Sequence, residues 1–443
     1  GRRQLQFRRA NPHGRMILTK QGQFDQLSFT FAMPTTTRVL PRLRPDLEVM
    51  PSPVPEQPGL MIRDPYRFSD QTLIVPPLLA RCLACFDGQQ TEGDLRERLT
   101  RLTGQVVVGE PAAHLIEALG EAGFLDDEVF AAMKDKRQRA FEAAPQRAAV
   151  HAGGGYPAER QPLRDVLGRS ISDGKIATNG RPLRGIAAPH VSPEGGYPSY
   201  GAAYGALPTD DGLGERTFVV LGTSHYGQPD RFGLTRKAFA TPFGRTTADT
   251  ALVDALIRDG GDDAVVVEDY CHAIEHSVEF QVVYLQHLFG AAVRVLPILC
   301  GPFLAAHGDP RLPEKNPAVA RFLDTLGELN ARRGQQLLWV LGIDMTHVGA
   351  RYGDHFHARA GEGPLQEIEA RDRQRIERIN AGDAAGFWDL VGENGGDDLK
   401  WCGSSPIYTF LRAVPEARGQ LLRYQQWNID PASVVSFAAL GFS

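Results

Sequence analysis

The last two thirds of the chain alternate short, continuously apolar runs with longer amphipathic stretches. Runs of this composition are typical of strands buried on both faces, and such strands need helices packed on each side of the sheet. The pattern predicts an α/β layer fold for residues 148–443. The runs are GIAAPH (185–190), TFVVLGTSH (217–225), VRVLPILCG (293–301), LLWVLGIDMTH (337–347) and VVSFAALGF (434–442).

Three of these runs lead directly into histidine or aspartate. His190 and His225 each end a run, and Asp344 is followed three residues later by His347. Ligands of open α/β sheets bind beyond the carboxyl ends of the strands. A single histidine there is more often a satisfied structural residue, but three strands that deliver histidine to one edge indicate a metal or catalytic site.

Two further segments fit such a site. Glu275 and His276 precede an amphipathic helix and are expected to supply supporting contacts or a proton relay. Cys402 stands in a turn before an apolar helix, where the helix amino terminus favours the thiolate. Cys402 therefore suits either a metal ligand or a nucleophile.

The amino-terminal third is organised differently. Residues 1–58 are basic and then rich in proline, which predicts a flexible, extended leader. Residues 59–130 predict a hairpin, three short helices and a final strand at Phe124–Leu125, which is the order of a winged helix-turn-helix. Residues 131–147 predict a basic linker.

The order DGQQT, DL..RL and HLIEALGEAGFLDD between residues 87 and 127 resembles PqqD-like domains. This resemblance implies a peptide or protein partner for the small domain. Nucleic acid is not expected as a partner, because residues 110–130 contain no Lys or Arg to neutralise phosphate.

Composition adds limits on the environment. The net charge is −5 and the five cysteines make no disulfide framework, which favours a reducing, cytoplasmic location. No apolar run approaches the roughly 20 residues of a membrane span, so no membrane partner is expected. Four cysteines, all except Cys402, are interpreted as structural.

The region 148–443 resembles the MEMO family, whose fold is similar to that of class III (LigB-type) extradiol dioxygenases. The matching segments run in order through the whole region. They are HAGGGYP (151–157), IAAPH (186–190), LGTSH (221–225), TPFG (241–244), EHSVEFQ (275–281), LPILCG (296–301), DMTHVG (344–349), WCGSSPI (401–407) and SVVSFAAL (433–440).

The resemblance implies roles for individual residues. His190, His225 and Cys402 fall on the metal-ligand positions, and His347 falls on the acid/base position of the dioxygenases with Asp344 beside it. Fe(II) is the expected metal, with Zn or Cu as competitors because a thiolate is a soft ligand. The expected activity is oxidation of a small or peptide-borne substrate by a non-haem iron oxygenase or oxidase, with Asp344 holding His347 in orientation.

Two alternatives stay open. Cys402 could be the nucleophile of a metal-free hydrolase or transferase, with His347 as its base. The domain could also be a protein-binding module without turnover.

Overall fold

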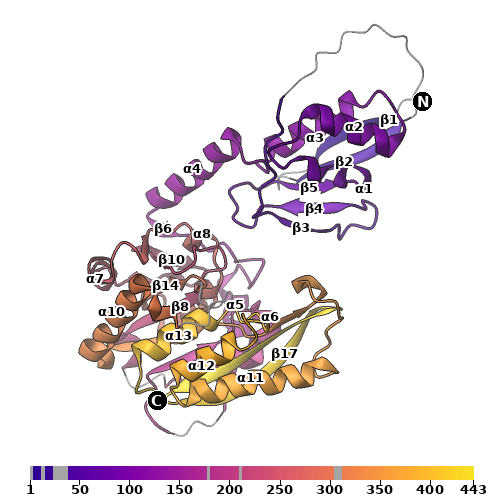
Figure 1. The fold of residues 1–443 in the computed structure, drawn as a ribbon. Helices are drawn as coiled ribbons and strands as arrows, with labels where there is room; N and C mark the ends of the chain where they lie inside the picture. The colour runs from indigo at the N-terminus through magenta and orange to yellow at the C-terminus, as the bar shows by residue number, and fades with distance from the viewer. Residues whose placement is uncertain (1–2, 11–14, 23–37, 177–179, 209–211, 304–311) are drawn as a thin grey trace. The chain divides into compact units, whose positions relative to one another are not determined.

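The computed structural model describes residues 3–10, 15–22, 38–176, 180–208, 212–303 and 312–443 (Figure 1). The chain divides into two compact units, Gly1–Ala143 and Ala144–Ser443. Each unit has buried apolar clusters of its own, and each is therefore described by itself.

The first unit combines a five-stranded sheet with helices. The strand order is β1-β2-β5-β4-β3. The hairpin predicted within residues 59–130 is confirmed, because β4 and β5 pair in antiparallel register. The strands are β1 (Arg3–Ala10), β2 (Arg15–Gly22), β3 (Glu48–Pro51), β4 (Leu60–Arg63) and β5 (Thr72–Val75), and the helices are α1 (Pro77–Ala80), η1 (Leu83–Cys85), α2 (Glu92–Thr103), α3 (Gly109–Glu121) and α4 (Glu128–Ala143).

Local sequence signals explain where these helices begin and end. The Thr91 side chain accepts a hydrogen bond from the Asp94 backbone N–H, and the Asp94 carboxylate accepts one from the Thr91 backbone N–H, which completes a capping box. Gly104 ends α2 with a φ of 69°, a conformation that glycine adopts without strain.

The described residues do not show the predicted winged helix. Leu125, in the expected wing strand, contributes a single bridge to Leu43. Strands β1 to β3 fall within residues 1–58, and α4 covers most of residues 131–147. The boundaries proposed for leader, small domain and linker stay predictions.

The second unit is built on a ten-stranded mixed sheet with the order β13-β9-β14-β8-β15-β7-β18-β16, to which β12 and β17 add through β14 and β18. The strands of the two sheets of this unit are β6 (Gln146–Arg147), β7 (Gly185–Ala188), β8 (Thr217–Thr223), β9 (Phe232–Leu234), β10 (Ala238–Thr241), β11 (Gly244–Arg245), β12 (Thr247–Ala248), β13 (Val265–Val267), β14 (Arg294–Cys300), β15 (Leu337–Gly342), β16 (His347–Gly349), β17 (Gly419–Asp430) and β18 (Ser433–Phe442). A smaller sheet joins β11, β10 and β6.

Helices cover both faces of the large sheet. They are α5 (Arg160–Gly174), α6 (Pro193–Gly205), α7 (Thr250–Gly260), α8 (Cys271–Ile274), α9 (Ser277–Phe289), α10 (Pro317–Arg333), α11 (Pro364–Asn380), α12 (Ala384–Gly392) and α13 (Ser404–Ala413), with short 3₁₀ helices η2 (Leu213–Glu215), η4 (Pro313–Lys315), η5 (Gly334–Gln336) and η6 (Ala350–Tyr352).

Alternate residues of the central strands enter two different cores. In β8, Val219 and Leu221 pack in the cluster that includes α7 and α10 to α13, whereas Phe218 and Val220 pack with α5, α6 and α9. This two-sided burial explains why the strand sequences are continuously apolar. The predicted α/β class is confirmed, with a sheet that mixes parallel and antiparallel pairs.

The central strands are parallel and adjacent. β15 pairs in parallel with β8 on one side and with β7 on the other, so the carboxyl ends of these three strands meet at one edge. Beyond β7 the sheet continues with antiparallel β18. Among the described residues, no helix combines the length and the apolar character needed to cross a bilayer.

Candidate metal centre

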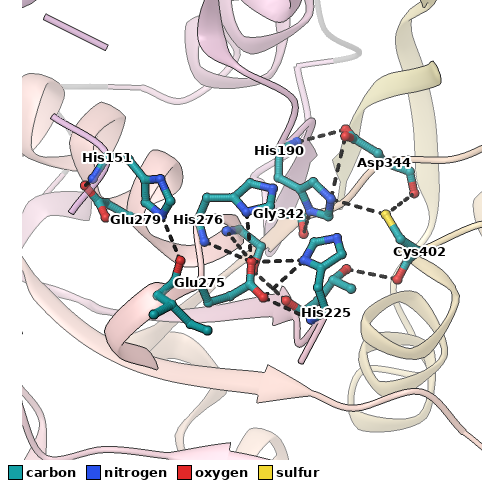
Figure 2. Close-up of polar contacts among 12 residues, drawn as sticks. His151, His190, His225, Glu275, His276, Glu279, Gly342, Asp344 and Cys402 are labelled. Atoms are coloured by element: carbon teal, nitrogen blue, oxygen red, sulfur yellow. Dashed lines mark hydrogen bonds and ion pairs between the residues drawn. The ribbon is translucent and has the colours of Figure 1, made fainter. Parts of the chain in front are cut away.

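The edge where β7, β8 and β15 end brings together two of the three histidines predicted there, His190 and His225. His190 follows β7, His225 follows β8, and the ring centroids of these two residues lie 5.0 Å apart (Figure 2). His276 joins them from the turn before α9, at 5.1 Å from His190 and 4.9 Å from His225. Three imidazoles thus converge on one point.

His190 is buried and has its ring fixed by the backbone. Its Nδ1 lies 2.9 Å from the carbonyl oxygen of Gly342, which can only accept, so Nδ1 carries the proton. Burial, with His225 and His276 nearby, holds the pKa of His190 well below its usual value. The residue is therefore a neutral imidazole whose Nε2 lone pair is free to ligate.

His225 is oriented by a buried carboxylate. Its Nδ1 lies 3.0 and 3.1 Å from the two Glu275 oxygens, and its backbone N–H donates to Glu275 at 2.9 Å. Burial opposes the charged imidazolium, but Glu275 outweighs burial and raises the pKa of His225 well above its usual value. Nε2 of His225 consequently points away from Glu275 and carries a proton that a metal would displace.

Glu275 serves two histidines at once. It also accepts from the backbone N–H of His276 at 2.8 Å and from that of Ser277 at 3.2 Å, and His276 Nδ1 lies 3.1 Å from it. Burial would raise the pKa of Glu275, but His225 and His276 hold it well below its usual range. The carboxylate therefore acts as an acceptor that orients both rings.

Glycines let the turn before α9 approach the strand ends. A Cβ at Gly342 would meet the Ser277 carbonyl oxygen at 2.2 Å, and one at Gly222 would meet the Ser277 hydroxyl at 2.5 Å. Only glycine at these two strand positions allows Glu275 to come within reach of His225.

Arg147 holds the turn before α9 through its backbone carbonyls. Its buried guanidinium donates to the carbonyl oxygens of His272 and Glu275, each at 2.8 Å, and pairs with Glu279. Glu279 in turn accepts from the backbone N–H of His151 at 3.2 Å. Neither Arg147 nor Glu279 was expected as a site residue from the strand-end pattern, because Arg147 fell in the segment predicted to be a linker and Glu279 lies within α9.

Cys402 completes a triad of ligating groups. Its Sγ lies 3.2 Å from His190 Nε2. Among the described residues, the ligating atoms of His190, His225 and Cys402 all lie within 4.8 Å of one another. His225, Glu275 and His276 form a second such group, but the hydrogen bonds to Glu275 occupy its oxygens. The triad of two imidazoles and a thiol is therefore the set that fits a metal.

Asp344 lies at the same edge, 2% exposed. Its Oδ1 accepts from the backbone N–H of His190 at 2.9 Å, and its Oδ2 lies 3.6 Å from His190 Nε2. Burial raises the pKa of Asp344 to about 7, although hydrogen bonds from the His190 and Val191 backbone oppose the shift. Asp344 can therefore hold or release a proton near neutral pH.

His347 is held differently from the expectation. Its Nδ1 donates to the carbonyl oxygens of Met345, at 2.8 Å, and Lys400, at 3.1 Å. Asp344 instead contacts His190, so the prediction that Asp344 orients His347 is wrong, because the hydrogen bonds of His347 Nδ1 go to backbone carbonyl oxygens. Burial lowers the pKa of His347 to about 4, which leaves the ring neutral with a free Nε2.

A cavity of about 290 Å³ opens beside His225 and Cys402. Its walls combine aromatic rings with hydroxyl groups and one lysine, which suits a small molecule with both apolar and polar parts. The other lining residues are Thr223, Ser224, Cys300, Pro302, Phe303, Trp388, Asp397, Lys400, Trp401, Ser404 and Ser405.

Comparisons with known proteins show the family of the chain. A family model described as Memo-like protein matches residues 147–441. A MEMO1 family protein of Aquifex aeolicus is 27% identical over 393 residues, covering 86% of this chain and 95% of the relative.

Two further relatives match a smaller share of the chain. A MEMO1 family protein of Methanopyrus kandleri is 29% identical over 312 residues, covering 67% of this chain and 99% of the relative. One from Thermus thermophilus is 27% identical over 342 residues, covering 76% and 94%. Because the family model spans more than half of the sequence, the chain belongs to the Memo-like protein family.

Proposed function

We propose that the second unit is a non-haem metal-dependent oxidoreductase that holds Fe(II) through His190, His225 and Cys402 and acts on a small or peptide-borne substrate. The observation that carries this proposal is the convergence of three ligating atoms within 4.8 Å. In both histidines the other ring nitrogen is already hydrogen-bonded, which is the arrangement that metal-binding histidines need.

The donor set supports iron and also admits competitors. Held by these three protein ligands, Fe(II) would supply the redox chemistry that reaction with O₂ requires. A thiolate ligand suits Zn and Cu as well, so loading with each metal is part of the test. The raised pKa of His225 makes its deprotonation part of metal binding.

The protein's own groups account for proton handling. His347 is neutral at pH 7, because its pKa is about 4, and its Nε2 can accept a proton from a substrate hydroxyl. Asp344, with a pKa of about 7, can take up or return a proton beside His190. The neighbouring cavity gives the substrate a place next to His225 and Cys402.

The metal-free alternative keeps one supporting observation, the 3.2 Å contact between Cys402 Sγ and His190 Nε2. Burial raises the pKa of Cys402, although His225 opposes the shift, and a thiol that stays protonated is a weak nucleophile. This alternative therefore needs a base for Cys402, and His190 is the imidazole whose Nε2 contacts the sulfur. A non-catalytic binding module is the third reading.

Anaerobic loading separates these functions. The proposal predicts one Fe(II) per chain in the wild type and none in a His190→Ala, His225→Ala double variant. It also predicts that bound metal protects Cys402 from iodoacetamide. Rapid alkylation that is unaffected by metal would support the nucleophile, and a protein that binds neither metal nor small molecules would support the binding module.

The first unit is proposed to capture a peptide or protein partner, as the PqqD-like resemblance implies, and cytoplasmic location is proposed on the cysteine content. The acidic character of residues 110–130 supports a partner other than nucleic acid. Titration of the full chain with fluorescent basic peptides tests this, with labelled duplex DNA as the control expected not to bind.

A further inference from the structure

Helix α11 carries two charged residues on the face that it buries. Leu365, Ile368, Ile376 and Ile379 of this helix are buried, and Asp372 and Arg375 share their stripe with exposures of 0% and 2%. Charged residues are almost never fully buried without a specific partner. The contacts of Asp372 and Arg375 show what keeps them there.

Asp372 accepts four hydrogen bonds, two on each oxygen. Oδ1 accepts from the Thr346 hydroxyl at 2.6 Å and the Trp401 indole N–H at 2.8 Å. Oδ2 accepts from the Ser436 hydroxyl at 2.6 Å and the Tyr424 hydroxyl at 2.7 Å. The Oδ1 partners are the residues directly before His347 and Cys402 in the chain.

Arg375 holds the Cys402 segment at a second point. Its guanidinium donates to Asp397 at 2.8 Å and to the Leu390 carbonyl oxygen at 3.0 Å, and it lies 5.2 Å from the centre of the Trp401 ring. Asp397 accepts from the Trp401 backbone N–H at 2.9 Å and from the Ser404 hydroxyl at 3.1 Å. Contacts thus lie on both sides of Cys402.

The two segments held by α11 are also bonded to each other. The backbone N–H of His347 donates to the Leu399 carbonyl oxygen at 3.0 Å, and that of Gly403 donates to the Asp344 carbonyl oxygen at 3.0 Å. Displacing Trp401 or Thr346 would therefore move Cys402 and His347 together.

We propose that Asp372 and Arg375 are positioning residues, which act through Trp401 and Thr346 to set the Cys402 thiol and the His347 ring relative to His190. This inference rests on the proposed function, because it treats Cys402 as a metal ligand.

Stability alone does not account for two charged residues at this place. Burial raises the pKa of Asp372 in spite of its four donors, so the surroundings disfavour the carboxylate. Apolar residues of similar size are often as stabilising as buried charged groups, whereas buried polar groups can specify one geometry. A geometric role explains why the two donors on Oδ1, Thr346 and Trp401, come from the segments that carry His347 and Cys402.

The chemistry of the four donors gives a sharp test. The two donors on Oδ2 are hydroxyls, which can rotate and accept, whereas the Trp401 indole can only donate. In Asp372→Asn the amide oxygen can replace Oδ1 and the NH₂ group can face the hydroxyls of Ser436 and Tyr424. Asp372→Leu leaves the Thr346 hydroxyl without this acceptor and leaves the Trp401 indole only the Thr346 oxygen, 3.1 Å away.

The experiment is anaerobic Co(II) titration of the full chain, monitoring the near-ultraviolet thiolate-to-cobalt band. Asp372→Leu is expected to weaken Co(II) binding by about 10- to 100-fold, the usual effect of losing a partner behind a ligand, and to shift the band. Asp372→Asn is expected to keep both properties of the wild type.

Asn330→Leu is the matched control. Asn330 is buried and accepts the indole N–H of Trp339 at 3.3 Å, so its loss removes the same kind of contact at the opposite end of β15. This variant should melt at a lower temperature than the wild type while its Co(II) affinity and band stay unchanged.

The outcomes are decisive for each idea. A folded Asp372→Leu variant with the Co(II) affinity and thiolate band of the wild type would overturn the positioning role. The same conclusion would follow if Asp372→Asn and Asn330→Leu lost as much Co(II) affinity as Asp372→Leu. If Asp372→Leu does not fold, Thr346→Val and Arg375→Met decide in the same way. A wild type that binds Co(II) without a thiolate band would overturn the proposed function and the positioning role together.

Discussion

The imidazole and thiol sides of the candidate metal centre are built in different ways. His190 and His225 leave the ends of parallel strands, and their rings are fixed by the Gly342 carbonyl and the Glu275 carboxylate. Cys402 lies in a turn, anchored by a bond from the Thr223 hydroxyl to its carbonyl oxygen and by side chains of α11 acting on Trp401.

This difference shows which substitutions should disturb each side of the site. The sheet hydrogen bonds on both sides of β15 fix the strands that lead into His190 and His225. The imidazole side is therefore most simply disturbed by a substitution of a ligand or of Glu275. The thiol side depends on side-chain contacts several residues from the sulfur. Figure 1 shows α11 running alongside β17.

Loss of a ligand is the largest expected effect, and it should be similar on both sides. His190→Ala and Cys402→Ala should each lower Fe(II) affinity by more than the roughly 10- to 100-fold typical of a supporting residue. Metal analysis after anaerobic dialysis against a chelator measures this. Stoichiometric iron in Cys402→Ala would mean that the thiol is not a ligand.

Glu275→Gln tests the imidazole side with the ligands intact. The amide can keep one acceptor but not the charge, so Fe(II) affinity should fall by about 10- to 100-fold. His225 should also lose its proton at lower pH, because the Glu275 carboxylate, together with Cys402, raises its pKa against the effect of burial. Histidine NMR of the metal-free protein follows this titration, and an unchanged His225 would contradict the assigned contact.

His225 on the imidazole side and His347 beside the Cys402 segment should also differ in protonation. In the metal-free protein at pH 6, His347 should be neutral with its proton on Nδ1, since its pKa is about 4, while His225 is charged. Nitrogen-15 spectra distinguish these states, with His347→Gln supplying the assignment. A His347 that titrates near its ordinary value would show that its ring is not buried as described.

Asp372→Asn gives the smallest effect, on stability alone. Because the pKa of Asp372 is raised on folding, the folded wild type binds a proton more tightly than the unfolded chain. Its stability should therefore fall, relative to Asp372→Asn, as pH rises from the ordinary aspartate range through the raised value. Urea unfolding at several pH values measures the difference, and parallel curves would contradict the buried carboxylate.

Much of the imidazole side could be predicted from the sequence. An apolar strand followed by histidine is a local pattern, and parallel pairing brings such strand ends together. The family resemblance implied that Asp344 orients His347, which was wrong because the backbone carbonyls that hold His347 carry no sequence signal. His276 lies in the turn between Glu275 and α9 and contacts Glu275, as its place beside Glu275 in the sequence predicted.

The thiol side was harder to predict, for physical reasons. Asp372 interrupts an apolar helical stripe four residues after Ile368, and that interruption was the available signal. Its four donors are between 26 and 64 residues distant in sequence, so only the fold shows that it is satisfied. In the first unit, the cap residues of α2 are visible in the local sequence, whereas the order of the strands is not.

The most direct test of the central claim is iron K-edge X-ray absorption of the anaerobically loaded wild type beside Cys402→Ser. If Cys402 is a ligand, the wild type should show one sulfur neighbour together with nitrogen and oxygen neighbours, and the variant should lose the sulfur. A wild-type spectrum with nitrogen and oxygen neighbours alone would contradict it.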